Sequence, residues 1–243
     1  MLDLILTRHG MTTAPDVMLG GQLDVPLSDQ GRQEARRLAE RMRGIRVDRL
    51  ISSPMQRALE TAQTIAEGRP IEVDERLREL DYGRWEGLTH AEIQARDFDL
   101  WAAWEKDPAA THSPQGECGD DVAARAAELL RSLLDRELGP TAQRPAHWRS
   151  PDAGGMSARL TTESESEEAG ERRVMLVGHG AWNRIALCVA LGVPVRDYRR
   201  RFIQERCNLT VLRYEAGDTP AGAQLVLSND VTHLRHSGEA PWG

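Results

Sequence analysis

The sequence has few cysteines and no long apolar run. Both absences narrow the classes of protein to which the chain can belong. Its three cysteines, Cys118, Cys188 and Cys207, are odd in number and widely spaced, so they match neither a disulfide framework nor a zinc-binding pattern. No segment approaches the roughly 20 apolar residues of a membrane span. The apolar start, residues 1–6, contains Asp3 and no basic residue, unlike a signal peptide. We therefore expect a reduced, cytoplasmic protein that does not enter a membrane.

Basic side chains are fewer than acidic ones, and nearly all of them are arginine. The 243 residues include 31 basic and 38 acidic side chains, a net charge of −7, which argues against a general nucleic-acid binder. Lys106 is the one lysine, and every other basic residue is arginine. We interpret this skew mainly as background composition, although arginines focused in one pocket can still bind a small anion.

The apolar pattern predicts strands and helices in alternation. The alternation implies an α/β fold, a three-layer α/β/α sandwich whose mostly parallel central sheet is covered on both faces. The expected strands are residues 2–7, 47–52, 71–73, 174–177, 209–214 and 224–227. The expected helices are one capped by Ser28 and ending near Met42, one opened by Ser53 and Pro54, one opened by a capping box at Thr89, and those at about 119–138 and 181–191.

The composition changes between the helix expected at about 119–138 and the strand expected at 174–177. Residues 161–168 contain no apolar side chain, so this run cannot offset the entropy of its own ordering. We predict a single domain over residues 1–243 with a flexible acidic insertion at about 140–171.

Two histidines directly follow apolar strands. Arg8-His9-Gly10 ends the first strand, and Gly178-His179-Gly180 ends a late strand and precedes a helix. Ligands of open α/β sheets bind beyond the carboxyl ends of the strands, and the backbone N–H groups of a helix starting at Ala181 suit an anion. Arg57, just after another strand, offers a two-pronged donor to phosphate or carboxylate. We expect these groups to converge on one anion site.

A zinc site is a competing use of two histidines. No third ligand has a recognisable spacing, and adjacent arginines would repel a cation. The sequence therefore favours a site without a metal.

The motifs around these residues resemble those of the histidine phosphatase (phosphoglycerate mutase-like) superfamily. They occur in the family's order from residue 6 to residue 234, and the acidic run falls between two of them. The resemblance implies the phosphoglycerate mutase-like α/β/α fold. The matching segments are 6–12 (R-H-G-x-T), 24–35 (D-x-P-L-S/T-x-x-G-x-x-E/Q-A), 52–62 (S-S-x-x-x-R-A-x-x-T-A), 77–87 (L-x-E-x-x-x-G-x-W-E-G), 115–118 (Q-G-E-C for the family's G-G-E-S), 178–180 and 229–234 (N-D-x-x-H-L).

The resemblance also implies roles for the site residues. His9 would be the catalytic nucleophile that forms a phosphohistidine, and Arg8, Arg57 and His179 would hold the phosphoryl oxygens. Glu79 would give a proton to the leaving alcohol and then activate water. These roles agree with the chemistry, because a phosphoryl group in transfer is stabilised by a cationic cradle and a neutral imidazole is a competent nucleophile. No cofactor is implied.

Further phosphate contacts are expected from the neighbours of the two histidines. Thr12 belongs to the first motif, and Gly180 to the second. Many family members have an asparagine where this chain has Pro15. We hypothesise that Asn183, in the first turn after His179, supplies that contact.

The sequence leaves the roles of two glutamates and two tryptophans open. Glu86 could compete with Glu79 as the proton donor. Glu117 could shape the pocket or cap the helix that begins at Gly119. Trp101 and Trp104 lie in the segment 88–118 that we expect to govern specificity, where they either line an apolar pocket or pack beneath it.

The predicted function is a histidine acid-type phosphatase, a phosphoric monoester hydrolase that acts on a small phosphorylated metabolite. Candidate substrates are α-ribazole 5′-phosphate, sugar phosphates and phosphoglycerates. A phosphoglycerate mutase, which returns the phosphoryl group to its substrate, is the alternative. A non-catalytic phosphate-binding module is the third hypothesis, supported by the acidic insertion alone. No nucleic-acid or membrane partner is expected, and the sequence does not indicate an oligomeric state.

Overall fold

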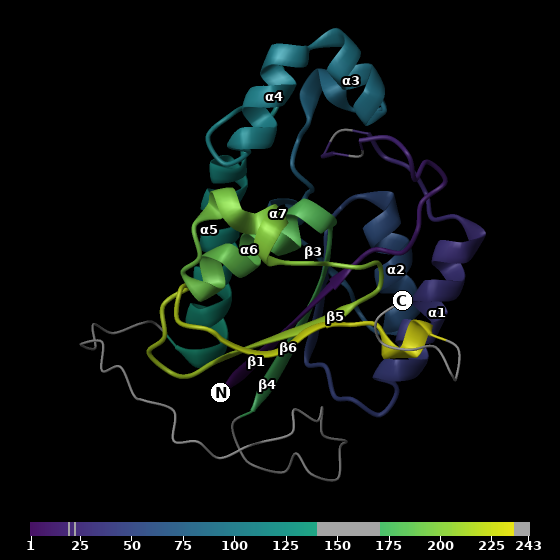
Figure 1. The fold of residues 1–243 in the computed structure, drawn as a ribbon. Helices are drawn as coiled ribbons and strands as arrows, with labels where there is room; N and C mark the ends of the chain where they lie inside the picture. Colours follow the sequence, from purple (N-terminus) through teal and green to yellow (C-terminus); the bar gives the residue numbers. More distant parts are fainter. Residues whose placement is uncertain (19, 22, 140–170, 236–243) are drawn as a thin grey trace.

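A computed structural model describes residues 1–18, 20–21, 23–139 and 171–235 as a mixed α/β fold around a six-stranded sheet (Figure 1). The strand order is β3-β2-β4-β1-β5-β6. The strands are β1 (Leu2–Arg8), β2 (Arg49–Ser52), β3 (Glu72–Val73), β4 (Arg172–Gly178), β5 (Leu209–Tyr214) and β6 (Gln224–Asp230). The helices are α1 (Asp29–Met42), α2 (Gln56–Ala66), α3 (His90–Arg96), α4 (Phe98–Lys106), α5 (Gly119–Leu138), α6 (Gly180–Leu191) and α7 (Tyr198–Arg201).

The sheet has a parallel part and an antiparallel edge. β3, β2, β4 and β1 run parallel to one another, as expected. β5 runs antiparallel to β1, and β6 antiparallel to β5. A parallel pair needs a crossover of a dozen or more residues, whereas an antiparallel pair can be joined by a short loop. The connection from β5 to β6 contains no helix, so this part of the chain departs from the predicted strand–helix alternation.

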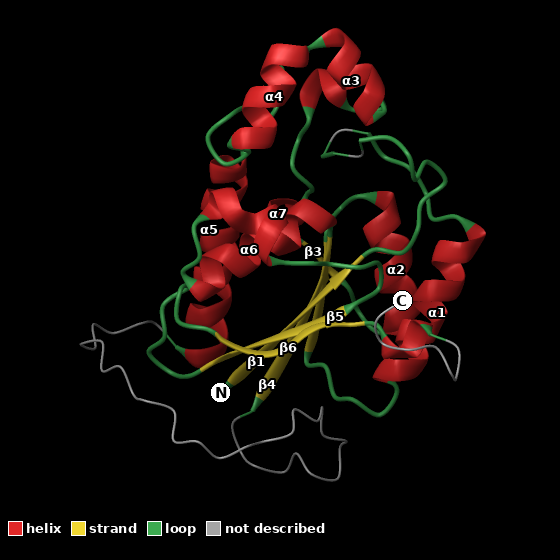
Figure 2. Cartoon of the chain, viewed as in Figure 1, coloured by secondary structure: helices red, strands yellow, loops and turns green. Residues whose placement is uncertain are grey.

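Helices cover both faces of the sheet, which confirms the three layers (Figure 2). Successive side chains of a strand point to opposite faces. Leu4 and Leu6 of β1 accordingly pack in the core that contains α5 and α6, whereas Ile5 packs in the core that contains α1 and α2. Both cores are apolar, so burial of these faces holds the layers together.

Most predicted helix ends are confirmed. The Ser28 side chain caps α1 by accepting from the Gly31 amide, Thr89 and Glu92 form the capping box of α3, and Gly192 ends α6 in the left-handed conformation. The predicted start of α2 is wrong, because the helix begins at Gln56. The Ser53 amide instead bonds to the β4 carbonyl of Val177, which keeps that residue aligned with the sheet.

Two further expectations concern the acidic insertion and the absence of a membrane span. The predicted acidic insertion lies almost wholly outside the described residues. Within the described part of the chain, no helix has the length and apolar character needed to cross a membrane.

Candidate active site

The two histidines meet at the carboxyl ends of β1 and β4, as predicted. Arg8 lies opposite Gly178 in the register of these parallel strands, and the His9 amide donates to the Gly178 carbonyl at 3.1 Å. The rings of His9 and His179 consequently lie edge to face, with centroids 5.2 Å apart. Strand register thus brings together two motifs that lie far apart in the sequence.

His9 is held as a neutral imidazole with one free nitrogen. Its Nδ1 lies 2.7 Å from the carbonyl oxygen of Gly10; since a carbonyl only accepts, Nδ1 carries the proton and Nε2 keeps its lone pair. Burial, followed by the positive charges of Arg8 and Arg57, holds the pKa of His9 well below its ordinary value. His9 lines a cavity, and its Nε2 retains the lone pair that the predicted nucleophile role requires.

His179 is fully buried beside His9 and has a different environment. Its Nε2 lies 2.7 Å from Ser53 Oγ, which also accepts from the Met55 amide. The Ser53 hydroxyl can therefore donate to Nε2, which leaves the proton on Nδ1. Nδ1 has no hydrogen-bond partner among the described residues. Burial, and then the charge of Arg57, lowers the pKa of His179 far below the ordinary value.

Arg8 projects its guanidinium group past Gly180 at the edge of the cavity. Its Nη1 donates to the Gln204 carbonyl at 3.1 Å, while Nε is buried without a partner in the described chain. A Cβ atom at Gly180 would lie 3.3 Å from Arg8 Cζ, so glycine leaves the space that the guanidinium needs. Burial and the neighbouring charge of Arg206 lower the pKa of Arg8 to about 10.

Arg57 is completely buried, unlike the solvated arginine that its position alone would suggest. Its two terminal nitrogens donate to the carbonyls of Leu23 at 3.1 Å and Gly20 at 2.9 Å. Its Nε, like that of Arg8, has no partner among the described residues. Burial lowers the pKa of Arg57, and the charge of Glu79 opposes that shift.

Glu79 occupies the N-terminus of α6 and lines the cavity. Its carboxylate accepts from the amides of Ala181 at 3.0 Å and Trp182 at 2.9 Å. We expected these amides to be free for a ligand; the structure shows that the protein's own carboxylate takes them, because a helix N-terminus attracts negative charge. Glu86, the competing carboxylate, instead accepts from the amides of Leu23 and Tyr82.

Thr12 and Asn183 differ in their access to the cavity. Thr12 lines it, and pairs through its backbone with Leu27. Asn183 is fully buried and does not line it. The Asn183 amide nitrogen lies 3.4 Å from the side-chain oxygen of Gln204, the residue whose carbonyl holds Arg8. Asn183 is therefore linked to Arg8 through Gln204 and does not face the cavity, so its predicted direct contact with phosphate has no support in this geometry.

Glu117 is part of a buttress behind Glu79. Arg125 pairs with the Glu117 carboxylate and also donates to the backbone carbonyl of Glu79 at 3.1 Å. Glu117 in turn accepts from the Asp81 amide at 3.0 Å. The capping role considered for Glu117 falls to other residues, so Glu117 shapes the segment that carries Glu79.

A cavity of about 310 Å³ is lined by Arg8, His9, Thr12, Glu79 and Gly180 among the predicted site residues, whereas His179 and Arg57 lie beside it and do not line it. Trp104 lines it, whereas Trp101 packs against Trp85 and Trp104. Several lining residues were not anticipated from the sequence. One of them had a usable signal, because Arg184 follows Gly180 by four residues and so shares its face of α6. The unanticipated residues are Val17, Met18, His90, Arg184, Tyr198, Arg199 and Arg206.

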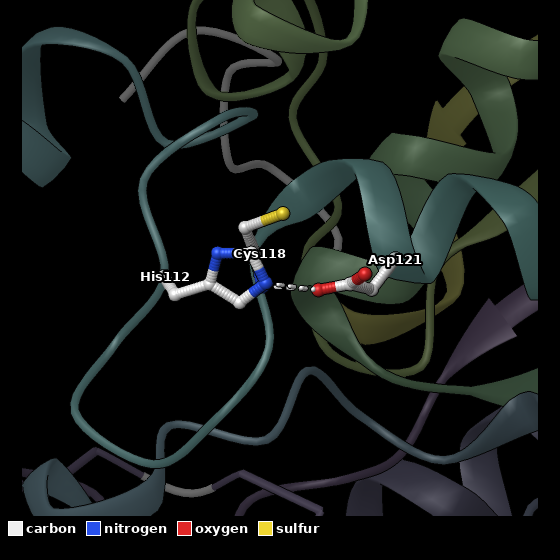
Figure 3. Close-up of side chains that lie close together, drawn as sticks. All are labelled: His112, Cys118 and Asp121. Atoms are coloured by element: carbon white, nitrogen blue, oxygen red, sulfur yellow. Dashed lines mark hydrogen bonds and ion pairs between the residues drawn. The ribbon is translucent and has the colours of Figure 1, made fainter.

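A separate cluster of possible metal ligands lies at the start of α5 (Figure 3). One ligand atom from each of His112, Cys118 and Asp121 lies within 4.8 Å of the others. Cys118 and Asp121 form the capping box of α5, and His112 pairs with the Asp121 carboxylate at 2.9 Å. Helix capping and a surface ion pair therefore account for the cluster.

Comparison with known proteins identifies the family. The model of the histidine phosphatase superfamily (branch 1) matches residues 4–147 and 155–229. Glucosyl-3-phosphoglycerate phosphatase of Mycobacterium tuberculosis is 34% identical over 202 residues, which cover 80% of this chain and 78% of that protein. The probable phosphoglycerate mutase GpmB of Cronobacter sakazakii is 27% identical over 239 residues, or 96% of this chain and 95% of that protein.

The solved structures agree with the sequence relatives. The structure of YhfR from Bacillus stearothermophilus has a TM-score of 0.76 and 29% identity, and the match covers 97% of this chain and all of that one. The fold, the ordered motifs and the match along most of the chain lead to the same conclusion. This chain belongs to the histidine phosphatase superfamily.

Proposed function

We propose that the protein is a phosphomonoesterase that hydrolyses a small phosphorylated metabolite through a phosphohistidine on His9, without a metal. One observation carries the proposal. The ring of His179 packs against that of His9, and the charges of Arg8 and Arg57 act on His9. Each of these three neighbours has a buried nitrogen without a partner in the described chain, namely His179 Nδ1, Arg8 Nε and Arg57 Nε. An unpaired buried donor costs about 1–3 kcal/mol. A phosphoryl group has three equatorial oxygens that can accept from these donors.

In the first step, His9 Nε2 attacks phosphorus and the ester P–O bond breaks. The bonding electrons leave on the alcohol oxygen, which takes a proton from Glu79. Arg8 and Arg57 stabilise the charge that spreads over the equatorial oxygens, and such preorganised donors supply most of the rate enhancement. The hydrogen bonds from the amides of Ala181 and Trp182 keep the Glu79 carboxyl group in place.

In the second step, water attacks the phosphohistidine and the P–N bond breaks. The Glu79 carboxylate takes a proton from this water, and the electrons of the P–N bond return to His9 Nε2. Inorganic phosphate leaves, and both residues regain their starting states. One carboxyl group therefore serves as acid and then as base.

The relatives support hydrolysis over transfer back to the substrate. A phosphatase is 34% identical to this chain, and its name places the phosphate on a small metabolite, glucosyl-3-phosphoglycerate. The mutase alternative is supported by the probable phosphoglycerate mutase that matches 96% of the chain. A non-catalytic module is disfavoured, because His9, Arg8 and Glu79 all line one cavity, and the ring of His179 packs against that of His9.

Phosphate release from p-nitrophenyl phosphate and a panel of small phosphate esters tests the proposal. We expect turnover by the wild type and a loss of about 10³-fold or more in His9→Ala, since nucleophile removal is among the costliest catalytic changes. Brief incubation with ³²P-labelled ester followed by alkaline quenching should label His9. With labelled p-nitrophenyl phosphate, whose nitrophenolate leaves without a proton, Glu79→Gln should accumulate this label, because only the hydrolysis step then lacks its base.

Controls separate the competing functions. His112→Ala changes an exposed histidine outside the cavity and should keep wild-type turnover. Primed with bisphosphoglycerate, a mutase would convert 3-phosphoglycerate to 2-phosphoglycerate without releasing phosphate, which would contradict hydrolysis. A wild type inert towards every ester would favour the non-catalytic module.

A further inference from the structure

Arg8 is held at both ends by the segment that joins α7 to β5 (Figure 1). Its backbone amide donates to Asn208 Oδ1 at 3.2 Å, and its Nη1 donates to the Gln204 carbonyl at 3.1 Å. The Arg8 carbonyl accepts from the Cys207 amide at 2.8 Å. Residues 204–208 therefore hold both the main chain and the guanidinium group of this arginine.

Asn208 lies where the ladder between β1 and β5 ends. The last pair of these antiparallel strands is Leu6 with Thr210, and two more residues of the same register would place Asn208 opposite Arg8. Cys207 has a left-handed backbone with a φ of 49°, so the chain is not extended at that point. The side chain of Asn208 thus supplies the acceptor for the Arg8 amide at the end of the ladder.

The other end of the Asn208 side chain contacts the residue that holds the guanidinium group. Asn208 Nδ2 donates to Gln204 Oε1 and to Thr210 Oγ1, each at 3.0 Å. Gln204 Nε2 donates to the same Thr210 oxygen at 2.9 Å. All three side chains are fully buried. Because buried polar groups keep their hydrogen-bond partners, Asn208 and Gln204 are fixed as one unit.

This unit of Asn208, Gln204 and Thr210 is neutral, which matters for the arginine that it holds. A carboxylate in the same place would pair with Arg8 and cancel the charge that a phosphoryl group needs. Neutral amide and carbonyl dipoles fix the guanidinium group and leave its charge intact. The Nε of Arg8 is buried without a partner among the described residues, so it remains as a donor for an anion.

We propose that Asn208 is a positioning residue, whose side chain fixes the Arg8 backbone directly and the Arg8 guanidinium group through Gln204. The inference rests on the proposed function, in which Arg8 stabilises the phosphoryl group in transfer. Such a donor is effective only at its correct position, and a displacement of about 1 Å can cost about 10²-fold in rate. Asn208 is fully buried and does not line the cavity, so it acts through Arg8.

A double-mutant cycle in kcat/KM is the main test. Asn208→Ala should lower kcat/KM for p-nitrophenyl phosphate about 10²-fold, because Arg8 loses its anchor. In the Arg8→Gln background the same change should cost less than about 2-fold, since no guanidinium group remains to be positioned. A structural role would lower activity equally in both backgrounds, and that result would overturn the proposal.

Asn229→Gly is the matched control. The Asn229 side chain holds the same segment, but by accepting from the Glu205 amide at 2.8 Å. Glycine tolerates the left-handed φ of 50° at this position, and water can reach Glu205, which is exposed. This variant should keep kcat/KM within about 2-fold of the wild type. A loss as large as that of Asn208→Ala would mean that any loosening of the segment lowers activity, and would also overturn the proposal.

Gln204→Met serves if Asn208→Ala does not fold. This variant keeps the bond from the Arg8 amide to Asn208 and removes the side-chain bonds that tie Gln204 to Asn208 and Thr210. It should lower kcat/KM about 10-fold when Arg8 is present, since one of the two anchors remains. In the Arg8→Gln background it should cost less than about 2-fold, and equal losses would again contradict the proposal.

Phosphate binding separates failure of this inference from failure of the proposed function. Inorganic phosphate is titrated calorimetrically into the wild type, Asn208→Ala, Arg8→Gln and the double variant. Asn208→Ala should weaken binding about 10-fold only when Arg8 is present, because a charge-assisted hydrogen bond is misplaced. If this cycle holds but no ester is hydrolysed, the placement of Arg8 by Asn208 stands and the phosphatase is rejected. Turnover with equal losses in both backgrounds would do the reverse, and a wild type that neither binds phosphate nor hydrolyses esters would overturn both.

Discussion

β1 and β4 place charged residues at both of their ends, and the two ends use them in opposite ways. At the amino end, Asp3 lies opposite both Arg173 and Arg213, and its carboxylate accepts from Arg213 at 2.7 and 2.9 Å. At the carboxyl end, Arg8 lies opposite Gly178 and forms no ion pair with a carboxylate of the residues that the structure describes. The same pair of strands thus begins at an ion-pair cluster and ends at a cationic site whose arginines form no direct ion pair among the described residues.

Burial does not distinguish these two ends, but pairing does. Asp3 is 2% exposed and Arg57 is fully buried. A buried charge is tolerated when it is paired and hydrogen-bonded, so the ion pairs with Arg213 and Arg173 offset the burial of the Asp3 carboxylate. Donors on Arg8, Arg57 and His179 lack partners in the described chain, which agrees with the anion site that we propose there. Buried arginine without a carboxylate therefore indicates function more strongly than burial alone.

The sharpest test of this comparison is Arg8→Gln. We expect kcat/KM for a phosphate ester to fall about 10³-fold, roughly 4 kcal/mol, because a preorganised charged donor to the phosphoryl group is lost. The free energy of unfolding should not fall, since the variant relieves repulsion from Arg184 and Arg206. Steady-state kinetics and urea unfolding measure both quantities. A variant that is destabilised but nearly as active would mean that Arg8 is structural.

The reciprocal change is Asp3→Asn at the other end of β1. We expect the free energy of unfolding to fall by about 3 kcal/mol, because Arg213 and Arg173 lose a buried countercharge. The folded variant should keep wild-type kcat/KM, since Asp3 lies at the far end of the strand. Arg46→Gln is the control; its pair with Asp48 is 48% exposed on the arginine side and should matter by less than about 1 kcal/mol. If the two variants lost the same free energy of unfolding, burial would not explain the stabilisation by the Asp3 ion pairs.

The smallest effect expected is a pH dependence of stability that arises at the carboxyl end. The pKa values of His9 and His179 are lowered in the folded protein, so below about pH 6.5 the unfolded chain binds protons that the folded protein does not. The free energy of unfolding should therefore fall as pH decreases from 6.5, by at most about 1.4 kcal/mol per pH unit for each histidine. Urea unfolding at pH 7.5, 6.5 and 5.5 measures the slope. The double variant His9→Ala with His179→Ala should have a smaller slope. If the free energy of unfolding fell equally with pH in wild type and variant, the two histidines would not be its cause.

The sequence predicted those site residues that belong to short motifs. His9 and His179 follow apolar strands, and strands that neighbour each other in a parallel sheet end at the same edge, so their meeting was foreseeable. Arg57 was foreseen as a phosphate ligand, but its bonds to the Gly20 and Leu23 carbonyls were not. Those bonds join segments that are distant in the sequence, and no local sequence pattern predicts that they meet.

The elements of secondary structure follow largely from local sequence, because apolar periodicity and capping residues act within one segment. Ser28, Thr89 and Gly192 mark helix ends for this reason. Tertiary packing decided the rest. It turned β5 and β6 antiparallel and put Glu79 on the N-terminus of α6, 102 residues away. It also left Arg184 and Arg206 beside Arg8 without carboxylates, because the partner of a charge depends on which distant segments pack around it.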